Sequence, residues 1–320
     1  MGSNPVRNIF NELKDILSRG CPFFDCYKKH TYFLTKLFGG KGLREYKSFY
    51  KSVGGNEGDK CNYSTRLDTY GCGCQHDCSY CYAKSLLDFR KLWNNEDPSV
   101  ADIKKIERKI AKLPKDTPPL RLGGMTDCFQ PIEKKYRNTY NTIKCLNENS
   151  IPYLIVTKSP MVADDEYINI LDKKLAHIQI TVTTTDDKLC STYEKAAPPS
   201  QRIEAIEKLF NLGYDVSLRL SPFIPQYIDY SVLNNVQCDK ILVEFLRANT
   251  WIKKWFNIDY SEYTVKQSGY AHLPLSKKIE YIKNITGFKE VSVCEDESKA
   301  YEYWRYNFNP NPNDCCNLAL

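Results

Sequence analysis

Residues 70–83, YGCGCQHDCSYCYA, decide the fold of this chain. They place Cys74, Cys78 and Cys81 at the spacing CxxxCxxC, after a short apolar run that ends at Leu67 and before a helical pattern that begins at Lys84. Three thiolates on one loop can ligate three irons of a [4Fe-4S] cube and leave the fourth iron without a protein ligand. The spacing therefore predicts a cluster with one open iron, to which a further ligand can bind.

A zinc site is the alternative interpretation of this loop. Cys72 or His76 would then complete a tetrahedral set with the three cysteines. Structural zinc sites usually take two ligand pairs from separate knuckles, whereas all the candidates here lie on one loop. The spacing thus favours the iron-sulfur cluster, and a non-catalytic zinc- or cluster-binding protein is the competing class.

Outward from this loop, short apolar runs alternate with helical patterns, which is typical of a parallel βα architecture. The helical patterns include residues 133–146 and 201–212, and Gly213 is a good C-terminal cap for the second. The predicted strands are 64–67, 120–123, 153–157, 178–183, 216–220 and 241–244. Six βα units predict an α/β fold, a partial (βα)6 TIM-type barrel of parallel strands.

Three segments follow from this pattern. Residues 1–63 form an N-terminal extension, with an amphipathic helix over 5–18 and an irregular segment after it. Residues 64–250 form the barrel. Residues 251–320 form a C-terminal cap, with a short strand near Val291 and a helix near 301–306.

Composition and charge narrow the class of protein. Hydrophobic residues make up 42% of the 320 and charged residues 26%, as in a soluble globular chain. There is no apolar run of roughly 18 residues and no secretory signal, so we expect a cytoplasmic protein without a membrane partner, whose fourteen cysteines are reduced. The net charge of +6 permits nucleic acid as a partner without favouring it.

A second cluster is not predicted. Cys21, Cys26 and Cys61 lie in the N-terminal extension, and Cys315 and Cys316 lie near the end of the chain. No group among them has compact cluster spacing. We therefore expect one cluster, with Cys315 and Cys316 as packing or incidental thiols.

Polar and glycine residues follow the predicted strands, at the edge where parallel βα folds bind ligands. Gly123 and Gly124 let the backbone approach a ligand closely, although a simple turn explains them equally well. Lys158 and Thr126 can bind a carboxylate by charge and by hydroxyl donation. Asp127 can accept the N–H groups of a guanine-like edge, which suggests a nucleobase-like substrate.

The run CxxxCxYC followed by Tyr-Ala resembles the radical S-adenosylmethionine (SAM) superfamily, and specifically the branch related to spore photoproduct lyase. Residues 123–136 resemble that branch's second-strand motif and 156–159 its third-strand motif. Residues 181–186, Arg202 and 219–225 continue the series. The resemblance, which covers 64 to about 245, implies a radical SAM lyase with a [4Fe-4S] cluster, SAM and a reductant such as flavodoxin or ferredoxin.

The resemblance also implies roles for single residues. Cys74, Cys78 and Cys81 would hold the cluster and act in catalysis. The residues in contact with SAM would be Tyr80, Tyr82, Gly123, Gly124, Thr126, Lys158, Thr181, Arg202 and Arg219. The substrate would contact Asp127, Gln130 and Glu133. For the two tyrosines the alternative is core burial, for each arginine a salt bridge, and for Glu133 a helix-start carboxylate.

One position departs from the branch. Spore photoproduct lyases carry a hydrogen-donating cysteine where this chain has Gly124, and Cys128 would point differently from the strand end. The whole chain is more similar to queuine lyases, which release the deazaguanine base preQ1 from queuine. The resemblance thus implies queuine as a small-molecule substrate, with DNA photoproduct repair or modification of another nucleoside as alternatives.

Overall fold

The computed structural model describes residues 46–51, 60–88 and 91–318. The helix predicted over 5–18, as well as Cys21 and Cys26, lies outside the described residues.

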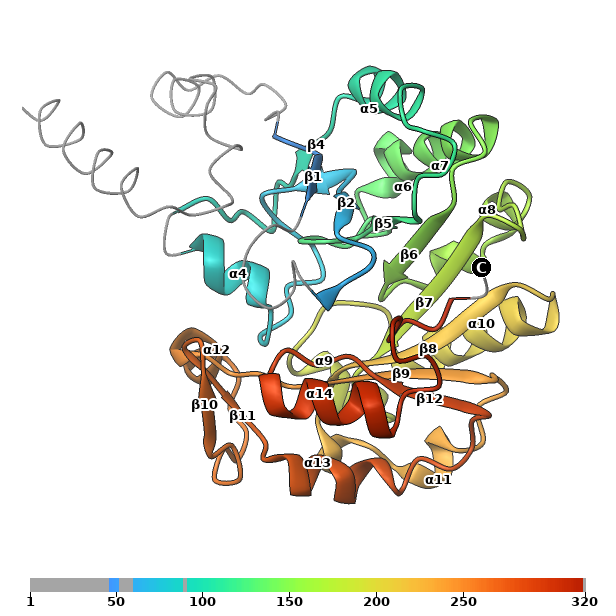
Figure 1. Ribbon diagram of the computed structural model, residues 1–320. Coiled ribbons are helices and arrows are strands. Elements are labelled where there is room, and N and C mark those ends of the chain that lie inside the picture. The colour runs from blue at the N-terminus through green and yellow to red at the C-terminus, as the bar shows by residue number, and fades with distance from the viewer. Residues whose placement is uncertain (1–45, 52–59, 89–90, 319–320) are drawn as a thin grey trace, which may run out of the picture.

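One sheet of eight strands organises the molecule (Figure 1), in the order β1-β2-β5-β6-β7-β8-β9-β12. Neighbours from β2 to β12 pair in parallel, and only β1 is antiparallel to its neighbour β2. The strands are β1 (Phe49–Lys51), β2 (Thr65–Leu67), β5 (Leu120–Leu122), β6 (Tyr153–Thr157), β7 (Ala176–Val182), β8 (Asp215–Phe223), β9 (Lys240–Phe245) and β12 (Glu290–Val293). The six predicted strands are confirmed as β2 and β5 to β9.

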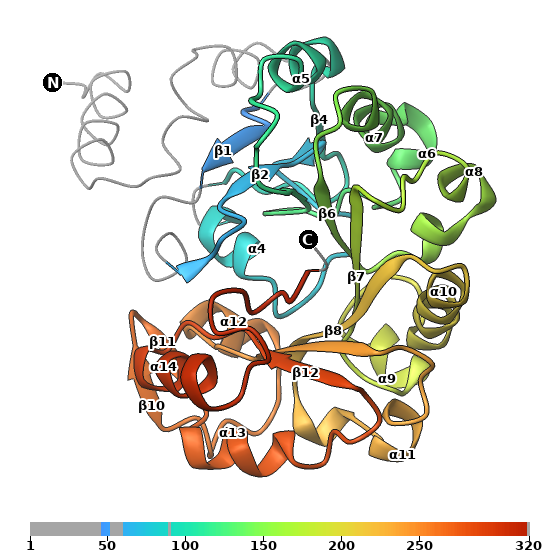
Figure 2. The same cartoon turned by 45° about the vertical axis from the view of Figure 1, so that its right-hand side comes forward.

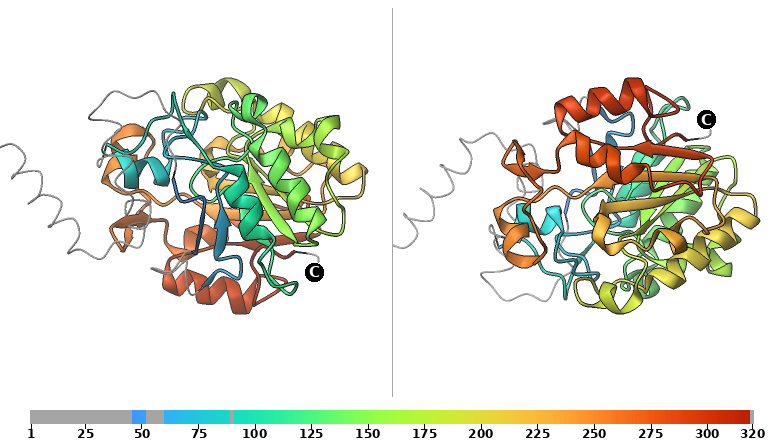
Figure 3. Two further views of the ribbon diagram at one scale, coloured as in Figure 1. Left: turned by 90° about the horizontal axis from the view of Figure 1, so that it is seen from above. Right: turned by 90° about the horizontal axis from the view of Figure 1, so that it is seen from below.

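The sheet curves, and the helices cover its outer face (Figure 2), which confirms the partial barrel. The helices are α4 (Tyr82–Leu87), α5 (Ile103–Ile110), α6 (Glu133–Tyr136), α7 (Asn138–Glu148), α8 (Asp165–Ile168), α9 (Asp187–Ser191), α10 (Pro199–Asn211), α11 (Tyr230–Leu233), α12 (Thr250–Trp255), α13 (Leu275–Ile282) and α14 (Ser298–Asn307). Seen from above and below, α4 and α12 lie toward one end of the molecule and α10 toward the other (Figure 3).

Two short ribbons supplement the main sheet. They pair β3 (Tyr70–Gly71) with β4 (Ser99–Val100), and β10 (Val265–Gln267) with β11 (Tyr270–His272), both antiparallel. Two 3-10 helices span Pro160–Ala163 and Pro225–Tyr227. The first ribbon lies directly before the cysteine loop and therefore helps to fix where that loop begins.

Helix α10 shows how the local pattern specifies an element. Ile206 and Leu209 are fully buried against the sheet, as their helical spacing predicts. The helix ends at Asn211, and Gly213, which follows the C-cap Leu212, has a φ of 79° in the left-handed region that favours glycine. The Tyr214 N–H then donates to the Leu209 carbonyl at 3.1 Å, as in a glycine-terminated cap.

The single helix predicted over 133–146 is wrong, because the chain divides it into α6 and α7 at Arg137, whose φ is 53°. The buried Glu133 carboxylate explains the break. It accepts the backbone N–H groups of Thr139 and Tyr140, each at 2.9 Å, and so satisfies donors at the start of α7. A side chain six and seven residues before these donors thus takes the place of an ordinary N-cap.

The C-terminal segment adds to the barrel as well as covering it. The predicted strand near Val291 is confirmed as β12, which pairs in parallel with β9, so the sheet continues past residue 250. The helix predicted over 301–306 lies within α14. Beyond it, residues 309–318 return to the inner side of the curved sheet (Figure 2), where Cys316 packs on Leu154 and Leu242.

Across the described ranges, no helix combines the length and the apolar character needed to cross a membrane.

Candidate active site

The cysteine loop follows β3 and is shaped by unusual backbone conformations. Cys72 and Asp77 have φ values of 51° and 43°. Gly73 passes so close to the Asn94 carbonyl that an added Cβ would lie 1.8 Å from that oxygen. The loop ends at Cys81, the N-cap of α4, whose sulfur accepts the Lys84 N–H at 3.4 Å. The loop is therefore a compact turn with little freedom to rearrange.

We call Cys74, Cys78 and Cys81 the loop cysteines. Burial raises the pKa of all three thiols, that of Cys74 to about 12, and the neighbouring loop thiols add to the effect at Cys74 and Cys78. Backbone N–H groups of His76 and Asp127 point to the Cys74 sulfur. The Lys158 ammonium opposes the pKa rise at the other two. The loop thus gathers buried sulfurs that a cationic cluster would convert to thiolates.

The donor set fits an iron-sulfur cluster better than zinc. No group of three or more His, Cys, Asp or Glu side chains within the described ranges already has metal-binding geometry, so a metal would draw these sulfurs together. His76, the proposed fourth zinc ligand, has its Nε2 3.2 Å from Asp127 Oδ2. The Cys72 thiol lies near Tyr46. Three sulfurs on one loop remain, the number that leaves one iron open.

Asp127 joins the loop to the ends of two strands. Its carboxylate accepts the Lys158 N–H at 2.6 Å, the Thr157 hydroxyl at 2.7 Å and the Phe129 N–H at 2.8 Å. Burial would raise the pKa of Asp127, but His76 and these donors lower it to about 2. The carboxylate oxygens of Asp127 therefore accept hydrogen bonds from the protein itself rather than from a substrate.

Gln130 and Glu133, the other predicted substrate residues, are fully buried. Gln130 Oε1 accepts the Gln75 N–H at 2.9 Å and so holds the cysteine loop. Glu133 accepts hydroxyl groups from Tyr70 and, at 2.7 Å, from Tyr167, besides the two N–H groups at the start of α7. Both side chains support the loop from behind, and a substrate role for them stays a prediction.

Lys158 is the cation best placed for a ligand carboxylate. It follows β6, is only partly buried, and its Nζ lies 5.6 Å from the centroid of the Tyr80 ring. Its charge acts on Cys78, Cys81 and Glu194. An ammonium beside the loop cysteines is suited to bind an anionic group that approaches the cluster.

Arg202 and Arg219 are held in internal ion pairs. The Arg202 guanidinium, fully buried, pairs with Glu194 and donates to the carbonyls of Ala197 at 2.6 Å and Thr181 at 3.1 Å. Arg219 donates to Gln179 at 2.7 Å and pairs with Glu244. These pairs are buried, unlike the surface salt bridges considered from the sequence, and a contact to SAM stays a prediction for both arginines.

The two glycines after β5 pack against protein atoms. Gly123 has a φ of 83°, and an added Cβ would lie 2.5 Å from the Val156 carbonyl oxygen. At Gly124 a Cβ would lie 2.2 Å from the Tyr50 hydroxyl. That hydroxyl donates to Asp68 at 2.9 Å. A cysteine at residue 124 would therefore collide with Tyr50, which shows why glycine occupies this position.

The remaining predicted contacts lie around the same loop. The Tyr82 hydroxyl donates to the Gly124 carbonyl, and the Thr126 hydroxyl donates to the Tyr70 carbonyl at 2.5 Å. Tyr80 is buried against Tyr193 and Phe256, and its hydroxyl donates to Glu194. Thr181 is buried within β7. The contacts of these residues with SAM stay a prediction.

Two carboxylates of this network were not predicted from the sequence. Asp68, directly after β2, accepts the Gly124 N–H at 2.6 Å, and burial raises its pKa. Glu194 is buried between Arg202 and Tyr80, and its pKa is lowered to about 2, since Arg202 and Lys158 outweigh the effect of burial. The position of Asp68 at a strand end was a usable signal. Glu194 follows a helix of five residues and carried none.

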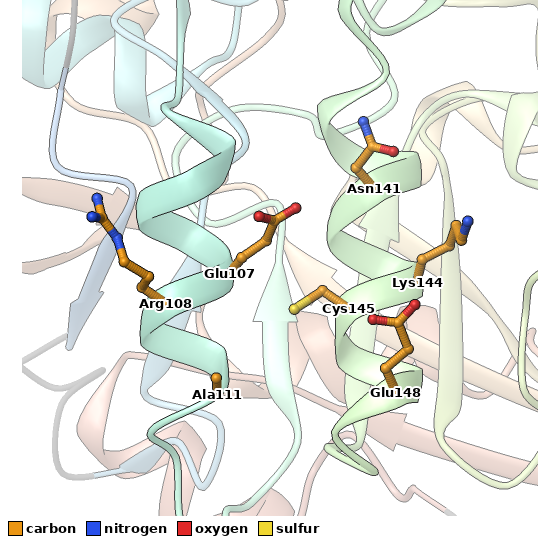
Figure 4. Close-up of a pocket in the computed structure, with 7 residues that line it drawn as sticks. All are labelled: Glu107, Arg108, Ala111, Asn141, Lys144, Cys145 and Glu148. Carbon is orange, nitrogen blue, oxygen red and sulfur yellow. The ribbon is translucent and has the colours of Figure 1, made fainter.

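A surface groove elsewhere has no part in this site. It lies between α5 and α7 (Figure 4) and shares none of the predicted residues. Glu107 and the Cys145 thiol point into the space between the helices, while Lys144 and Glu148 lie along α7. Its charges are of mixed sign, as in an ordinary contact between amphipathic helices.

The family model described as "Radical SAM superfamily" matches residues 69–229, just over half of the chain. The chain therefore belongs to the radical SAM superfamily and is a radical SAM enzyme. Enzymes of this superfamily use a [4Fe-4S] cluster and SAM, the cofactors that the loop predicts.

Two curated proteins, both uncharacterised, are similar to this chain in sequence. An uncharacterised protein of Methanocaldococcus jannaschii is 28% identical over 230 residues, covering 68% of this chain and 79% of its own. An uncharacterised protein of Acidianus two-tailed virus is 25% identical over 165 residues, covering 49% of this chain and 55% of its own.

Spore photoproduct lyase mutants have a similar fold. One with bound AdoMet and dinucleoside spore photoproduct matches with a TM-score of 0.52 at 11% identity, covering 87% of this chain and 92% of that one. Another matches with a TM-score of 0.54 at 13% identity, covering 84% and 79%. At these identities the likeness shows the fold alone.

Proposed function

We propose that the loop cysteines hold the [4Fe-4S] cluster and that this enzyme fragments a modified nucleobase, releasing preQ1 from queuine. The single observation that carries the proposal is the surroundings of Gly124. The Tyr50 hydroxyl fills the space in which a cysteine side chain would lie, and Cys128 is buried in the core. Within the described part of the chain, no cysteine is thus well positioned at this strand end to quench a product radical. A fragmentation does not need a thiol at this position.

The bound cluster and SAM together supply a 5′-deoxyadenosyl radical, which abstracts a hydrogen atom from the substrate. The chain's own residues position and shield these groups. Lys158 binds the SAM carboxylate, because it is the partly exposed cation beside the loop. Tyr80 and Tyr82 line the loop, while Asp127, Gln130 and Glu133 fix its position by their buried hydrogen bonds.

For queuine, the hydrogen atom leaves the cyclopentenediol ring, and the bond from that ring to the exocyclic amine then breaks. The amine stays with the deazaguanine, keeps the electron pair of the broken bond and takes up the proton that a ring hydroxyl releases, which gives preQ1. The cyclopentene fragment carries the unpaired electron and is quenched either by a hydrogen atom returned from 5′-deoxyadenosine or by an electron and a proton from the reductant. The ratio of SAM consumed to preQ1 formed distinguishes these two endings.

The test compares two substrates on the reconstituted enzyme under anaerobic conditions. We expect queuine to give preQ1 and 5′-deoxyadenosine, and queuine deuterated in the cyclopentenediol ring to transfer deuterium to 5′-deoxyadenosine. Cys128→Ala should retain this activity. Absence of preQ1 from queuine would overturn the substrate proposal. Conversion of a thymine photoproduct would instead favour the alternative of DNA photoproduct repair.

A further inference from the structure

Four cysteines from three distant segments meet at the inner side of the sheet. They are Cys61, Cys294, Cys315 and Cys316, which we call the tail cysteines. They share one small cluster with the apolar side chains of Leu154 and Leu242. The Cys315 thiol lies next to those of Cys294 and Cys316. Cys61 lies within the range of electrostatic interaction with Cys294 and Cys316.

Specific hydrogen bonds bring these segments together. The Tyr63 hydroxyl donates to Asp314 at 2.5 Å, and Asn62 donates to the Asn313 carbonyl, so the segment after Cys61 is tied to the tail. On the other side, Asn309 and Val293 exchange two hydrogen bonds, at 2.8 and 3.0 Å, directly before Cys294. Every segment that carries a tail cysteine is therefore anchored within two residues of it or by its own strand.

Two guanidinium groups adjoin the tail cysteines. Those of Arg121 and Arg219 lie near Cys316, and that of Arg121 also lies near Cys61. The Nε atom of Arg121 is buried and has no hydrogen-bond partner. The Asp314 carboxylate does not neutralise this cationic side, because it accepts the Tyr63 hydroxyl and the N–H groups of Cys316 and Leu318.

From this juxtaposition we infer that the four tail cysteines form a second metal centre, separate from the loop cysteines, which binds a thiophilic metal through four thiolates. Four thiolates are the closed ligand set of a structural zinc ion and equally of a fully ligated iron-sulfur cluster. Binding of Zn²⁺ to four neutral thiols releases four protons and gives a site of net charge −2, which Arg121 and Arg219 offset in part, because Glu244 already pairs with Arg219. No electron transfer is required.

This inference reverses the expectation of a single cluster. It also assigns the centre a location: it ties the C-terminal tail to the segment before β2 and to the end of β12, across the inner side of the barrel. The four sulfurs are not yet in metal-binding geometry, as is also true of the loop cysteines.

Metal analysis of the full-length protein tests the inference. Zinc, iron and acid-labile sulfide are measured after anaerobic purification in the wild type and in a variant with Cys74→Ser, Cys78→Ser and Cys81→Ser. We expect that variant to keep either about one zinc without sulfide, or iron with matching sulfide, the two forms of a four-thiolate centre. Adding Cys315→Ser and Cys316→Ser should remove this metal, whereas adding Cys145→Ser, the groove thiol of Figure 4, should not.

Cobalt substitution covers the case in which the fivefold variant fails to fold. In the loop variant, Co²⁺ should give the intense absorption of tetrahedral thiolate coordination, and Cys294→His should shift these bands without abolishing them. Three results would overturn the inference: no metal beyond trace in the loop variant, metal that persists without Cys315 and Cys316 in a folded protein, or a disulfide among the tail cysteines in place of metal.

Discussion

The loop cysteines and the tail cysteines are assembled in opposite ways. The first group lies within residues 74–81, so local backbone geometry alone brings its sulfurs together. The second group spans residues 61–316 and meets only because β12 joins the sheet and the tail returns inside it. Spacing in the sequence predicts a ligand group that lies on one loop. It does not predict a ligand group assembled from distant segments.

The two groups also differ in electrostatic surroundings. Behind the loop lie two buried carboxylates, Asp127 and Glu194, each with a pKa lowered to about 2 by its partners. The tail cysteines lie near the guanidinium groups of Arg121 and Arg219, and Glu244 pairs with the second. Each group of cysteines thus adjoins an arginine–carboxylate pair, and the tail side adds the guanidinium of Arg121.

Removal of one loop cysteine is expected to have the largest effect. Cys78→Ala takes away one of three iron ligands, so reductive cleavage of SAM to 5′-deoxyadenosine should fall to background. The measurement is 5′-deoxyadenosine formed per chain after anaerobic reconstitution. Cys145→Ala is the matched control, because its thiol is also buried but lies in the groove between α5 and α7.

The same assay on Cys316→Ala sharpens the comparison. We expect this variant to form 5′-deoxyadenosine, at a rate reduced by no more than its loss of folded protein. If Cys316→Ala abolished SAM cleavage as completely as Cys78→Ala does, the tail cysteines would belong to the catalytic centre and the division into two kinds of site would be wrong.

The second effect concerns the carboxylate behind the loop. Glu194→Ala leaves the fully buried Arg202 guanidinium without its counter-charge, which should lower the free energy of unfolding by about 3–5 kcal/mol. Urea unfolding followed by circular dichroism measures this. Glu204→Ala on the exposed face of α10 should change it little. Equal losses in the two variants would show that the Arg202 pair contributes nothing specific.

A smaller effect is expected from pH on the side of the barrel that carries the tail. The Glu244 carboxyl pairs with Arg219, and its pKa falls from 4.5 to about 2 despite burial. A depressed folded-state pKa gives stability that is complete above about pH 4.5 and is lost as pH falls toward 2, on the order of 2 kcal/mol. The metal-free Glu244→Gln variant should show a flatter decline over that range than the wild type. Parallel declines would contradict the assignment.

The sequence predicted the elements whose signals are local. Six parallel strands, the Gly213 cap and the strand near Val291 all followed from apolar runs and turn residues. The loop cysteines were equally visible, because chemistry that depends on one short loop is encoded in one short motif. These are the parts in which neighbours in sequence are neighbours in space.

Polar pairing inside the barrel was not predictable in the same way. Arg202 resembled a ligand-binding residue, yet it pairs with Glu194, which no pattern distinguishes from a surface acid. Glu133 had two interpretations, as a substrate contact or a helix-start carboxylate. It is the first residue of α6, and its hydrogen bonds to the start of α7 emerged only from the fold. Cys61 and Cys316 lie more than two hundred residues apart, and the sequence alone could not pair them.

The smallest effect is expected when the hydrogen bond between Tyr63 and Asp314, which holds the C-terminal tail, is removed. Tyr63→Phe removes the hydroxyl that Asp314 accepts, a loss of about 1 kcal/mol, while the carboxylate keeps the N–H groups of Cys316 and Leu318. The exposed Tyr306→Phe is the control. In metal-free protein, loosening of the tail should speed alkylation of Cys315 and Cys316 several-fold without affecting the loop cysteines. Bound metal should suppress the difference, because thiolates that share a metal hold the tail even when its hydrogen bond is gone. Unchanged alkylation in the metal-free variant would mean that the tail is fixed by packing on β6 and β9 rather than by Asp314.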